Sequence, residues 1–364
     1  MSLQLENVSR AVDGVDFIRD ADLTFEAGSF NVLLGRTLAG KTSLMRLMAG
    51  LDQPDSGRIL HNSEDVTGQG VRKRNVSMVY QQFINYPNLT VYENIASPLR
   101  LAKMKEQELD RRVKETAAML HIDNLLSRYP LELSGGQQQR TAMARALVKD
   151  ATLILFDEPL VNLDYKLREE LRSELRQLFR ERQCIAVYAT TEANEALALG
   201  GTTTLLHEGR VVQTGPVAEV YRRPVNTLAA ELFSEPPMNL LPGKVTGNSV
   251  TFGANIHHDL TRELGDLAEG DYLFGIRPSH VGLSPAGEDD LALEMEVELA
   301  EISGSETFLH VGAGVLDMVV QELGVHTRHP GGQVKIYLPM NRLFVFDQHR
   351  ALVHTPADSG GVHG

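Results

Sequence analysis

Continuous apolar runs alternate with helical patterns over roughly the first 230 residues of the chain. FNVLL at 30–34, TLILF at 152–156 and CIAVYA at 184–189 have the apolar character of strands that are buried on both faces. Between residues 165 and 182, apolar side chains recur every three or four positions and share one face of a helix. This alternation predicts an α/β domain.

The pattern changes near residues 224–243, where a Pro-Pro pair marks a boundary. The segments that follow are short, are separated by glycines and other turn residues, and predict the strands of a small all-β barrel or sandwich. The last residues, 355–364, are small and polar, and we expect them to be disordered. The predicted domains are residues 1–232, which are α/β, and residues 233–354, which are all-β.

Composition and charge disfavour several classes of protein. The 364 residues are 42% hydrophobic and 23% charged, as in a globular protein with a full core. The net charge of −13 argues against broad nucleic-acid binding, and we expect no nucleic-acid partner. The single cysteine, Cys184, excludes an intramolecular disulfide framework. No apolar run reaches the roughly 20 residues of a membrane span, and the N-terminus lacks a signal-peptide core, so we expect a soluble chain whose membrane role comes through a partner.

A glycine-rich segment after the first apolar run has the pattern of a phosphate-binding loop. GRTLAGKTS, residues 35–43, places Gly35 and Gly40-Lys41-Thr42 at the required spacing between a strand and a helix. Backbone N–H groups can then cradle a polyphosphate, Lys41 can reach its β and γ phosphates, and the Thr42 hydroxyl can bind Mg²⁺. The simpler alternative is a glycine turn before a helix.

A second segment, LILFDEP at 153–159, is an apolar strand that ends in two carboxylates. A carboxylate at this end of a strand beside a phosphate loop can hold Mg²⁺ through water, and its neighbour can polarise the attacking water. Asp157 is expected to take the first role and Glu158 the second. Alone, this pair would indicate only a polar loop; together with the phosphate loop it predicts a nucleotide hydrolase.

Between these segments lies LSGGQQQR at 133–140, where a Ser-Gly-Gly turn opens a helix and offers a second anion site. With Gln81 and the two motifs above, this order of motifs resembles the ATP-binding subunit of an ABC transporter. The resemblance implies an α/β P-loop NTPase with a helical subdomain at about 84–150.

The resemblance extends over essentially the whole chain. The segment at 78–99 is similar to the surface that couples sugar and polyol importers to their membrane subunits, and LGRTLAGKTSLMRLMAGLD resembles the glycerol-importer branch. The C-terminal region, with MNLLPG, GIRPSHV, SGSET and RLFVFD, is similar to the OB-like barrel of those importers, which contacts a dimer mate and often binds regulators.

The implied function is import of a carbohydrate-like solute. The implied partners are two transmembrane permease subunits, a second ATPase subunit, and a periplasmic or extracellular solute-binding protein. The implied location is peripheral, at the cytoplasmic face of the inner or plasma membrane.

In this family ATP is held with Mg²⁺ between two subunits, so each chain contributes to two sites. For the chain's own ATP the resemblance implies Gly35, Arg36, Thr37, Leu38, Ala39, Gly40, Lys41, Thr42, Ser43 and Gln81. The implied metal-binding residues are Thr42, Gln81 and Asp157, and the implied catalytic base is Glu158. The partner's ATP would be met by Ser134, Gly135, Gly136 and Gln137, and the D-loop between the two sites would be Asn162, Leu163 and Asp164.

Three positions depart from the family pattern. Val12 stands where an aromatic residue stacks on adenine, although Phe17 is a nearby aromatic alternative. Thr191 stands where a histidine contacts the γ-phosphate; it has one hydroxyl and cannot carry positive charge. Thr190 or Thr191 could also simply cap the following helix, with Glu195 as a partner. In the phosphate loop, Arg-Thr-Leu replaces the usual Pro-Ser-Gly, which leaves backbone binding intact.

The departures at Val12 and Thr191 fall on the chain's own ATP site, whereas its LSGGQ segment is intact. We therefore expect a non-identical ATPase partner and slow hydrolysis at the chain's own site. The alternative is a regulatory subunit that binds ATP with little turnover. An ATPase that acts on DNA or ribosomes is disfavoured, because the chain has one compact cassette and no sustained heptads.

Overall fold

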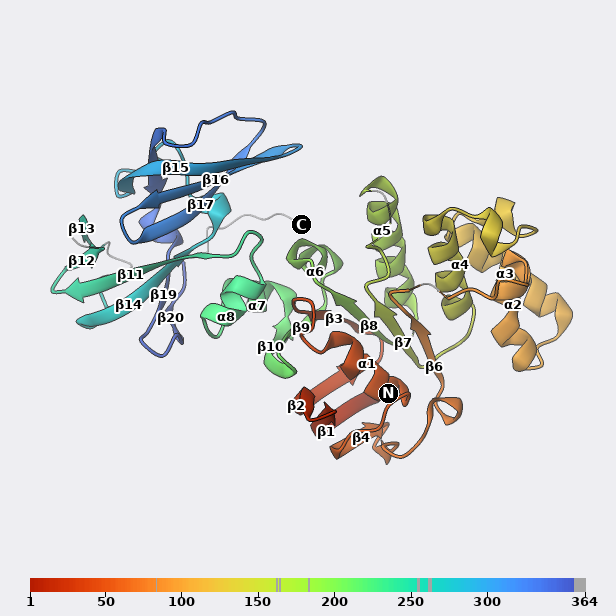
Figure 1. The fold of residues 1–364 in the computed structure, drawn as a ribbon. Coiled ribbons are helices and arrows are strands. Elements are labelled where there is room, and N and C mark those ends of the chain that lie inside the picture. Colours follow the sequence, from red (N-terminus) through yellow and green to blue (C-terminus); the bar gives the residue numbers. More distant parts are fainter. Residues whose placement is uncertain are drawn as a thin grey trace. The chain divides into compact units, whose positions relative to one another are not determined.

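A computed structural model of the chain describes residues 1–82, 84–161, 163, 165–182, 184–253, 256–260 and 264–356. The chain forms two compact units, Met1–Ala218 and Glu219–Gly364 (Figure 1). Among the described residues, no helix is long and apolar enough to cross a membrane.

The first unit is built on a six-stranded sheet in which five neighbouring strands are parallel and β10 pairs antiparallel with β9. In spatial order the strands are β10 (Arg210–Pro216), β9 (Thr202–His207), β3 (Phe30–Leu34), β8 (Ile185–Thr190), β7 (Leu153–Asp157) and β6 (Val76–Val79). The three apolar runs that predict strands are β3, β7 and β8. Every residue of β7 and β8 is buried, because helices and a second sheet cover the two faces of this sheet.

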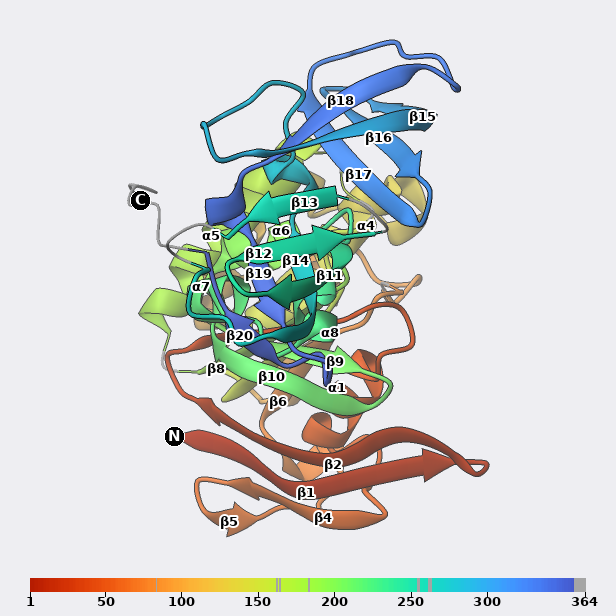
Figure 2. The same ribbon diagram turned by 90° about the vertical axis from the view of Figure 1, so that its left-hand side faces the viewer.

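A second, antiparallel sheet packs on this one through a shared core. It consists of β2 (Val15–Glu26), β1 (Ser2–Val12), β4 (Ser56–His61) and β5 (Glu64–Asp65), in that order (Figure 2). Helix α1 (Lys41–Ala49) contributes Leu44 and Met48 to a core cluster that also holds Leu5 of this sheet and Leu155 of the central sheet. The beginning of α1 is therefore fixed by packing from both sheets.

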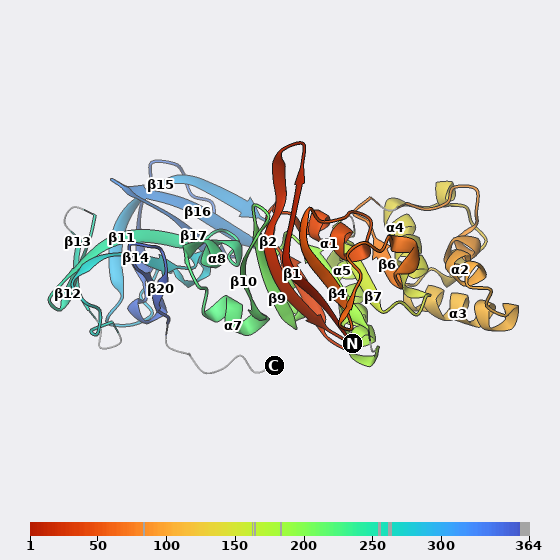
Figure 3. The ribbon, with the colours of Figure 1, turned by 90° about the horizontal axis from the view of Figure 1, so that it is seen from below.

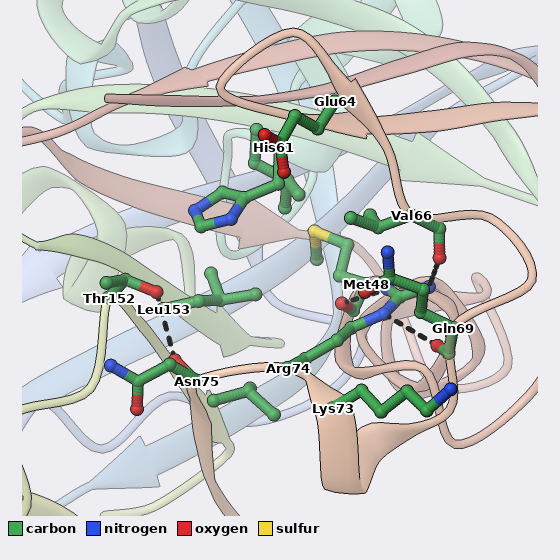
Figure 4. A pocket seen from close by; sticks show the side chains of 12 residues that line it. Met48, His61, Glu64, Val66, Gln69, Lys73, Arg74, Asn75, Thr152 and Leu153 are labelled. Carbon is green, nitrogen blue, oxygen red and sulfur yellow. Dashed lines mark hydrogen bonds between the residues drawn. The ribbon is translucent and has the colours of Figure 1, made fainter.

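An arginine closes the edge of this core. Arg74 follows the short 3-10 helix η1 (Val71–Lys73), and its guanidinium group donates to the carbonyl oxygens of Leu47, Met48, Val66 and Gln69. Beside it lies a cavity of about 250 Å³, which His61 also lines (Figure 4). Burial and the Arg74 charge lower the pKa of His61. The cavity contains none of the predicted ATP-site residues, so we regard it as part of the junction between η1 and the core.

Helices α2 (Val91–Leu101), α3 (Glu106–Met119) and α4 (Gly135–Leu147) come from the middle of the first unit's sequence, with the short 3-10 helices η2 (Asp123–Leu125) and η3 (Pro130–Glu132). Both α2 and α4 begin with a capping box, formed by Thr90 with Glu93 and by Ser134 with Gln137. Each box satisfies backbone N–H groups that a helix start leaves unpaired. Helices α5 (Tyr165–Glu181) and α6 (Ala193–Leu199) complete the unit.

The second unit is rich in strands and has its main core between two antiparallel sheets, which agrees with the predicted OB-like domain. The first sheet runs β13 (Ile256–Asp259), β12 (Ser249–Phe252), β11 (Asn239–Thr246), β14 (Gly270–Ile276), β19 (Phe344–Phe346) and β20 (Leu352–His354). The second runs β17 (Leu316–Leu323), β16 (Glu306–Ala313), β15 (Leu291–Ser303) and β18 (Gln333–Leu338). Short helical turns η4 (Pro278–His280) and η5 (Met340–Arg342) connect strands.

The boundary between the units lies earlier than the expected division at residues 232 and 233. Helix α7 (Val217–Arg222) crosses the observed boundary, and α8 (Thr227–Leu232) belongs to the second unit. The Arg277 guanidinium lies 3.8 Å from the ring centroid of Tyr221, and the Leu352 N–H donates to the Val225 carbonyl at 3.1 Å. These long-range contacts hold the segment before Pro236 in the second unit. Of the predicted disordered tail, residues 357–364 lie outside the described residues.

A buried carboxyl group joins β8 to α6. The Tyr188 hydroxyl donates to one oxygen of Glu195 at 2.7 Å, and the Thr190 hydroxyl donates to the other. All three residues are buried, and burial raises the pKa of Glu195 although both hydroxyl groups favour its charged form. Burial, together with the Glu195 charge, also raises the pKa of Tyr188 well above its usual range.

We predict that Glu195→Gln stabilises the protein at neutral pH. The pKa of Glu195 is higher in the folded protein than in the unfolded chain. The stability that its protonated form contributes is therefore fully present below the unfolded pKa, and it is lost as the pH rises toward the folded pKa. Glutamine removes this loss and can still bond both hydroxyl groups, so the gain should be on the order of 1 kcal/mol at pH 8 and small at pH 4. Urea denaturation at both pH values measures it.

The Glu288→Gln change, in an exposed turn, is the matched control for loss of one carboxylate and should leave the stability at neutral pH close to that of the parent. If Glu195→Gln destabilises the protein more at pH 8 than at pH 4, the ionised carboxylate is the native form and the prediction is wrong.

Candidate functional site

The predicted phosphate loop, residues 35–40, connects β3 to the first residue of α1. A Cβ atom on Gly35 would clash with the carbonyl oxygen of Leu206, and one on Gly40 would lie 2.8 Å from the carbonyl oxygen of Phe17. Gly40 has a φ of 103°, in the left-handed region that glycine adopts readily. Packing therefore requires both glycines, and the loop leads directly to the free N–H groups at the start of α1.

The side chains in the middle of the loop are exposed. Arg36, Thr37 and Leu38 are exposed, and Leu38 is 91% exposed with a φ of 67°. Ala39 is buried against the protein, and Ser43 is half-buried in the first turn of α1. The replacement of Pro-Ser-Gly therefore puts exposed side chains at positions 36–38 and leaves Gly35 and Gly40 in place.

Lys41 is buried and its ammonium group is held at the mouth of the loop. It donates to the carbonyl oxygens of Gly35 at 2.7 Å and of Arg36 at 3.2 Å. It also lies 3.3 Å from Oε1 of Glu158. A full positive charge is thereby placed beside the helix start, where both attract an anion.

Asp157, the last residue of β7, is buried and accepts a hydrogen bond of 2.8 Å from the Thr42 hydroxyl. Burial raises the pKa of Asp157, the Thr42 hydrogen bond opposes this shift, and the neighbouring Glu158 charge adds to it. A cation placed beside this carboxylate would favour its ionised form.

Glu158 comes directly after β7 and has a φ of 48°, in the left-handed region that a glutamate rarely adopts. Its N–H donates to the carbonyl oxygen of Ala189, at the end of β8, which helps to hold this conformation. The amide nitrogen of Gln81 donates to Oε2 of Glu158 at 3.1 Å, and the Lys41 ammonium faces Oε1. The carboxylate is thus positioned by two side chains from two other elements.

The donor atoms at this edge of the sheet fit magnesium. Thr42, Gln81 and Asp157 offer a hydroxyl, an amide and a carboxylate oxygen, and Mg²⁺ prefers oxygen donors with few protein ligands and several waters or phosphate oxygens. Within the described part of the chain, no group of three or more His, Cys, Asp or Glu side chains could hold a metal ion. A magnesium site completed by a nucleotide would not form such a group.

The segment Ser134–Gln137 lies at the start of α4 rather than in this cluster. The Ser134 N–H donates to the Gln137 side chain at 3.0 Å, and the Gln137 N–H donates to the Ser134 hydroxyl at 3.4 Å. Ser134 and Gly135 are exposed, whereas Gly136 and Gln137 are half-buried. The helix start therefore presents a serine hydroxyl and two glycines to an anion outside the chain's own phosphate loop.

Residues 138 and 139 of α4 contact two segments that also carry residues of the predicted ATP site: the one after Gln81 and the one after Glu158. The Asn85 side chain donates to the carbonyl oxygen of Gln138 at 2.8 Å, and the Gln139 side chain donates to that of Pro159. Leu163 is buried near Gly136, where an added Cβ would lie 3.1 Å from its side chain. The other two expected D-loop residues, Asn162 and Asp164, lie outside the described residues.

Val12 and Thr191, which depart from the family pattern, lie next to different strands. Val12 ends β1, pairs with Val15 across the hairpin and is 43% exposed. Thr191 follows β8 and is half-buried; its neighbour Thr190 is the residue whose carbonyl accepts from Gly35 N–H at 3.3 Å. Neither valine nor threonine offers an aromatic face or a charge.

The structure corrects the expected helix cap. The N-cap residue of α6 is Glu192, which makes no side-chain cap hydrogen bond. The Thr190 hydroxyl accepts from the Glu192 N–H at 3.0 Å, but it donates to Glu195 within the core. Sequence reasoning missed the bond between Tyr188 and Glu195; the signal was Tyr188 itself, a buried tyrosine whose hydroxyl needs a polar partner.

Comparisons with known proteins agree with this geometry. A family model described as "ABC transporter" matches residues 18–161. The sn-glycerol-3-phosphate import ATP-binding protein UgpC of Escherichia coli K12 is 36% identical over 348 residues, which cover 95% of this chain and 97% of that protein. The protein of the same name from Shigella sonnei has the same identity and coverage.

Solved structures support the same assignment for the first part of the chain. A dimeric structure of the cassette MJ0796 bound to ADP and Pi has a TM-score of 0.54 and 28% identity, and covers 59% of this chain and 98% of that one. A second dimeric structure of MJ0796, described as a bacterial ABC transporter cassette, has a TM-score of 0.55 and 27% identity with the same coverage. The chain therefore belongs to the ABC transporter ATP-binding protein family, whose members are ATPases.

Proposed function

We propose that ATP binds with its phosphates in the loop of residues 35–43 and is hydrolysed with Glu158 as the base. The observation that carries this proposal is the convergence of Lys41, Thr42, Gln81, Asp157 and Glu158, which contact one another at the end of β7. Thr42, Gln81 and Asp157 would hold Mg²⁺, which when bound neutralises charge on the β and γ phosphate oxygens.

The reaction requires an ordered base and a stabilised leaving group. A water oxygen attacks the γ-phosphorus, Glu158 accepts a proton from that water, and the bond to the β–γ bridging oxygen breaks to give ADP and phosphate. Gln81 and Lys41 hold the two oxygens of Glu158 in place. Lys41 and the start of α1 stabilise the charge that accumulates on the phosphate oxygens.

A second ATPase subunit would complete the site. Ser134, Gly135, Gly136 and Gln137 bond among themselves at the start of α4 and are available to a nucleotide held by another subunit. The two similar cassette structures are dimeric, which supports this arrangement. We propose that the partner is not identical, because Val12 and Thr191 weaken only the chain's own site while its contribution to the partner's site is intact.

The permease subunits are proposed to dock in a groove of the first unit. This groove of about 490 Å³ lies between β6, α2 and α4, and is lined by Met78, Tyr86, Leu101, Arg145 and Lys149 among others. Leu101 is 86% exposed, and Nη1 of Arg145 is buried with no hydrogen-bond partner in the described part of the chain. An amphipathic helix with one acidic residue would cover the leucine and satisfy the arginine.

The groove is also connected to the ATP site. Residues of β6 and α4 line it; β6 ends two residues before Gln81, and α4 has Ser134 as its N-cap. A helix seated there can therefore bias the positions of both segments when the two ATPase subunits close. With relatives named for sn-glycerol-3-phosphate import, we propose import of a sugar, glycerol or polyol-like solute supplied by an external binding protein, with this chain at the cytoplasmic face.

We predict that Glu158→Gln reduces ATP hydrolysis by the assembled transporter roughly 10²- to 10⁴-fold while ATP still binds, because the amide cannot accept the proton. Phosphate release with glycerol, sn-glycerol-3-phosphate and maltose as stimulating solutes measures both turnover and solute class. The matched control, Glu208→Gln on an exposed turn, should retain parental turnover. An unchanged rate in Glu158→Gln would instead support the regulatory alternative, in which this subunit binds ATP without turnover.

We predict that the chain alone hydrolyses ATP slowly and that Thr191→His accelerates it about tenfold, because an imidazole adds a charged donor near the γ-phosphate. Thr191→Ser is the matched control, since it keeps the hydroxyl and adds no charge. Rapid hydrolysis coupled to transport with this chain as the sole ATPase subunit would contradict the unequal pair.

We predict that Leu101→Asp prevents co-purification with the permease subunits while the isolated chain folds and binds ATP normally. A carboxylate placed in the apolar part of the groove would be desolvated on docking. Leu323→Asp, at an equally exposed leucine of β17, should co-purify like the parent. Loss of co-purification in both variants, or in neither, would rule out docking in this groove.

A further inference from the structure

The antiparallel pairing of β1 with β2 is interrupted at Phe17. Arg10 pairs with Ile18 and the next residue, Ala11, pairs with Asp16, so Phe17 is an extra residue with no partner on β1. Such a bulge turns a side chain out of the regular alternation, and bulges are frequent beside active sites. The bulge therefore changes the direction in which the Phe17 side chain leaves the strand.

The Phe17 ring is left partly on the surface. It is 38% exposed, whereas its neighbour Ile18 is 1% exposed and belongs to the core of the first unit. Val12 and Val15, at the tip of the same hairpin, are also exposed. An exposed aromatic ring beside a ligand-binding loop is a surface on which a planar group can stack.

The Phe17 backbone is fixed against the phosphate loop. Gly209 lies between them: its N–H donates to the Ala39 carbonyl at 3.0 Å, and its own carbonyl accepts from the Arg19 N–H at 2.8 Å. A Cβ atom on Gly209 would lie 2.6 Å from the Phe17 carbonyl oxygen, so only a glycine permits this approach. Figure 3 shows the β1–β2 hairpin beside α1 and projecting past it.

With the ATP phosphates bound in the loop as proposed, the nucleotide base would lie on this side. Glu158 and Gln81 lie at the end where the γ-phosphate is hydrolysed, and Lys41 faces them. The base is at the opposite end of ATP, one ribose beyond the α-phosphate. The hairpin that carries Phe17 borders the loop at Gly40, away from the Glu158 carboxylate.

We propose that Phe17 provides the aromatic face on which the adenine of ATP stacks, and that the bulge at Phe17 compensates for the aliphatic Val12. This inference rests on the proposed binding of the ATP phosphates at residues 35–43. Stacking contributes affinity with little preference among bases, so the ring anchors the nucleotide without selecting its identity.

The chain contains no tryptophan, so Phe17→Trp creates a single fluorescent reporter at the proposed contact. In the full-length Glu158→Gln protein with Mg²⁺, ATP should quench this fluorescence, and inorganic tripolyphosphate, which has no base, should not. Phe17→Ala should weaken ATP binding roughly 5- to 100-fold by calorimetry and leave tripolyphosphate binding unchanged. Val15→Trp and Val15→Ala, on the exposed tip of the same hairpin, are the matched controls.

The outcomes separate the inference from the proposed function. If Phe17→Ala binds ATP as tightly as the parent, or if Val15→Trp is quenched as strongly as Phe17→Trp, stacking on Phe17 is wrong while the phosphate site stands. If the parent binds neither ATP nor tripolyphosphate, the phosphate site is wrong and the inference falls with it. Equal weakening of ATP and tripolyphosphate by Phe17→Ala would show a structural effect on the loop and would also overturn it.

Discussion

The close packing of backbone around the phosphate loop is the constraint on which the rest of the first unit depends. At Gly35 the loop meets the end of β9, and at Gly40 it meets β2, in both cases with no space for a Cβ atom. The loop is also bonded to the end of β8 through the Gly35 N–H and the Thr190 carbonyl. Three segments that are distant in sequence must therefore converge before the loop has its shape. The two sheets and α1 share one hydrophobic core. Packing in this core brings β2, β8 and β9 to the loop.

The same convergence explains how charged groups are tolerated at the end of β7. Asp157 is buried and its pKa is raised, and Glu158 has a strained backbone conformation beside it. Two adjacent carboxylates would repel each other in such a site unless cations or donors faced them. Thr42 and Lys41 supply those donors from the first turn of α1, and Gln81 supplies one from the segment after β6. A magnesium nucleotide bound here would place a cation beside both carboxylates, next to the segment that carries Gln81.

Features that depend on local sequence were predictable, and features that depend on register were not. The strands β3, β7 and β8 and the loop between β3 and α1 follow from apolar runs and glycine spacing, which are properties of adjacent residues. The bulge at Phe17 depends on how β1 pairs with β2, and the Tyr188–Glu195 pair depends on how α6 lies against β8. The division between the units likewise depends on contacts between residues that are distant in sequence. Residues 219–232 look like part of the first domain along the chain, but Arg277 and Leu352 hold them in the second unit.

The position of Phe17 changes how the two departures from the family pattern should be weighed. If its ring supplies the stacking surface, Val12 is no longer a defect, and the chain's own site retains its affinity for the nucleotide. The departure that remains is Thr191, at the γ-phosphate end, where a neutral hydroxyl stands in place of an imidazole. A loss at that end affects the transition state more than the ground state, because charge develops on the γ-phosphate oxygens only as the bond breaks. Such a site would bind ATP and close normally but hydrolyse it slowly, so asymmetry in the pair would lie in turnover rather than in occupancy.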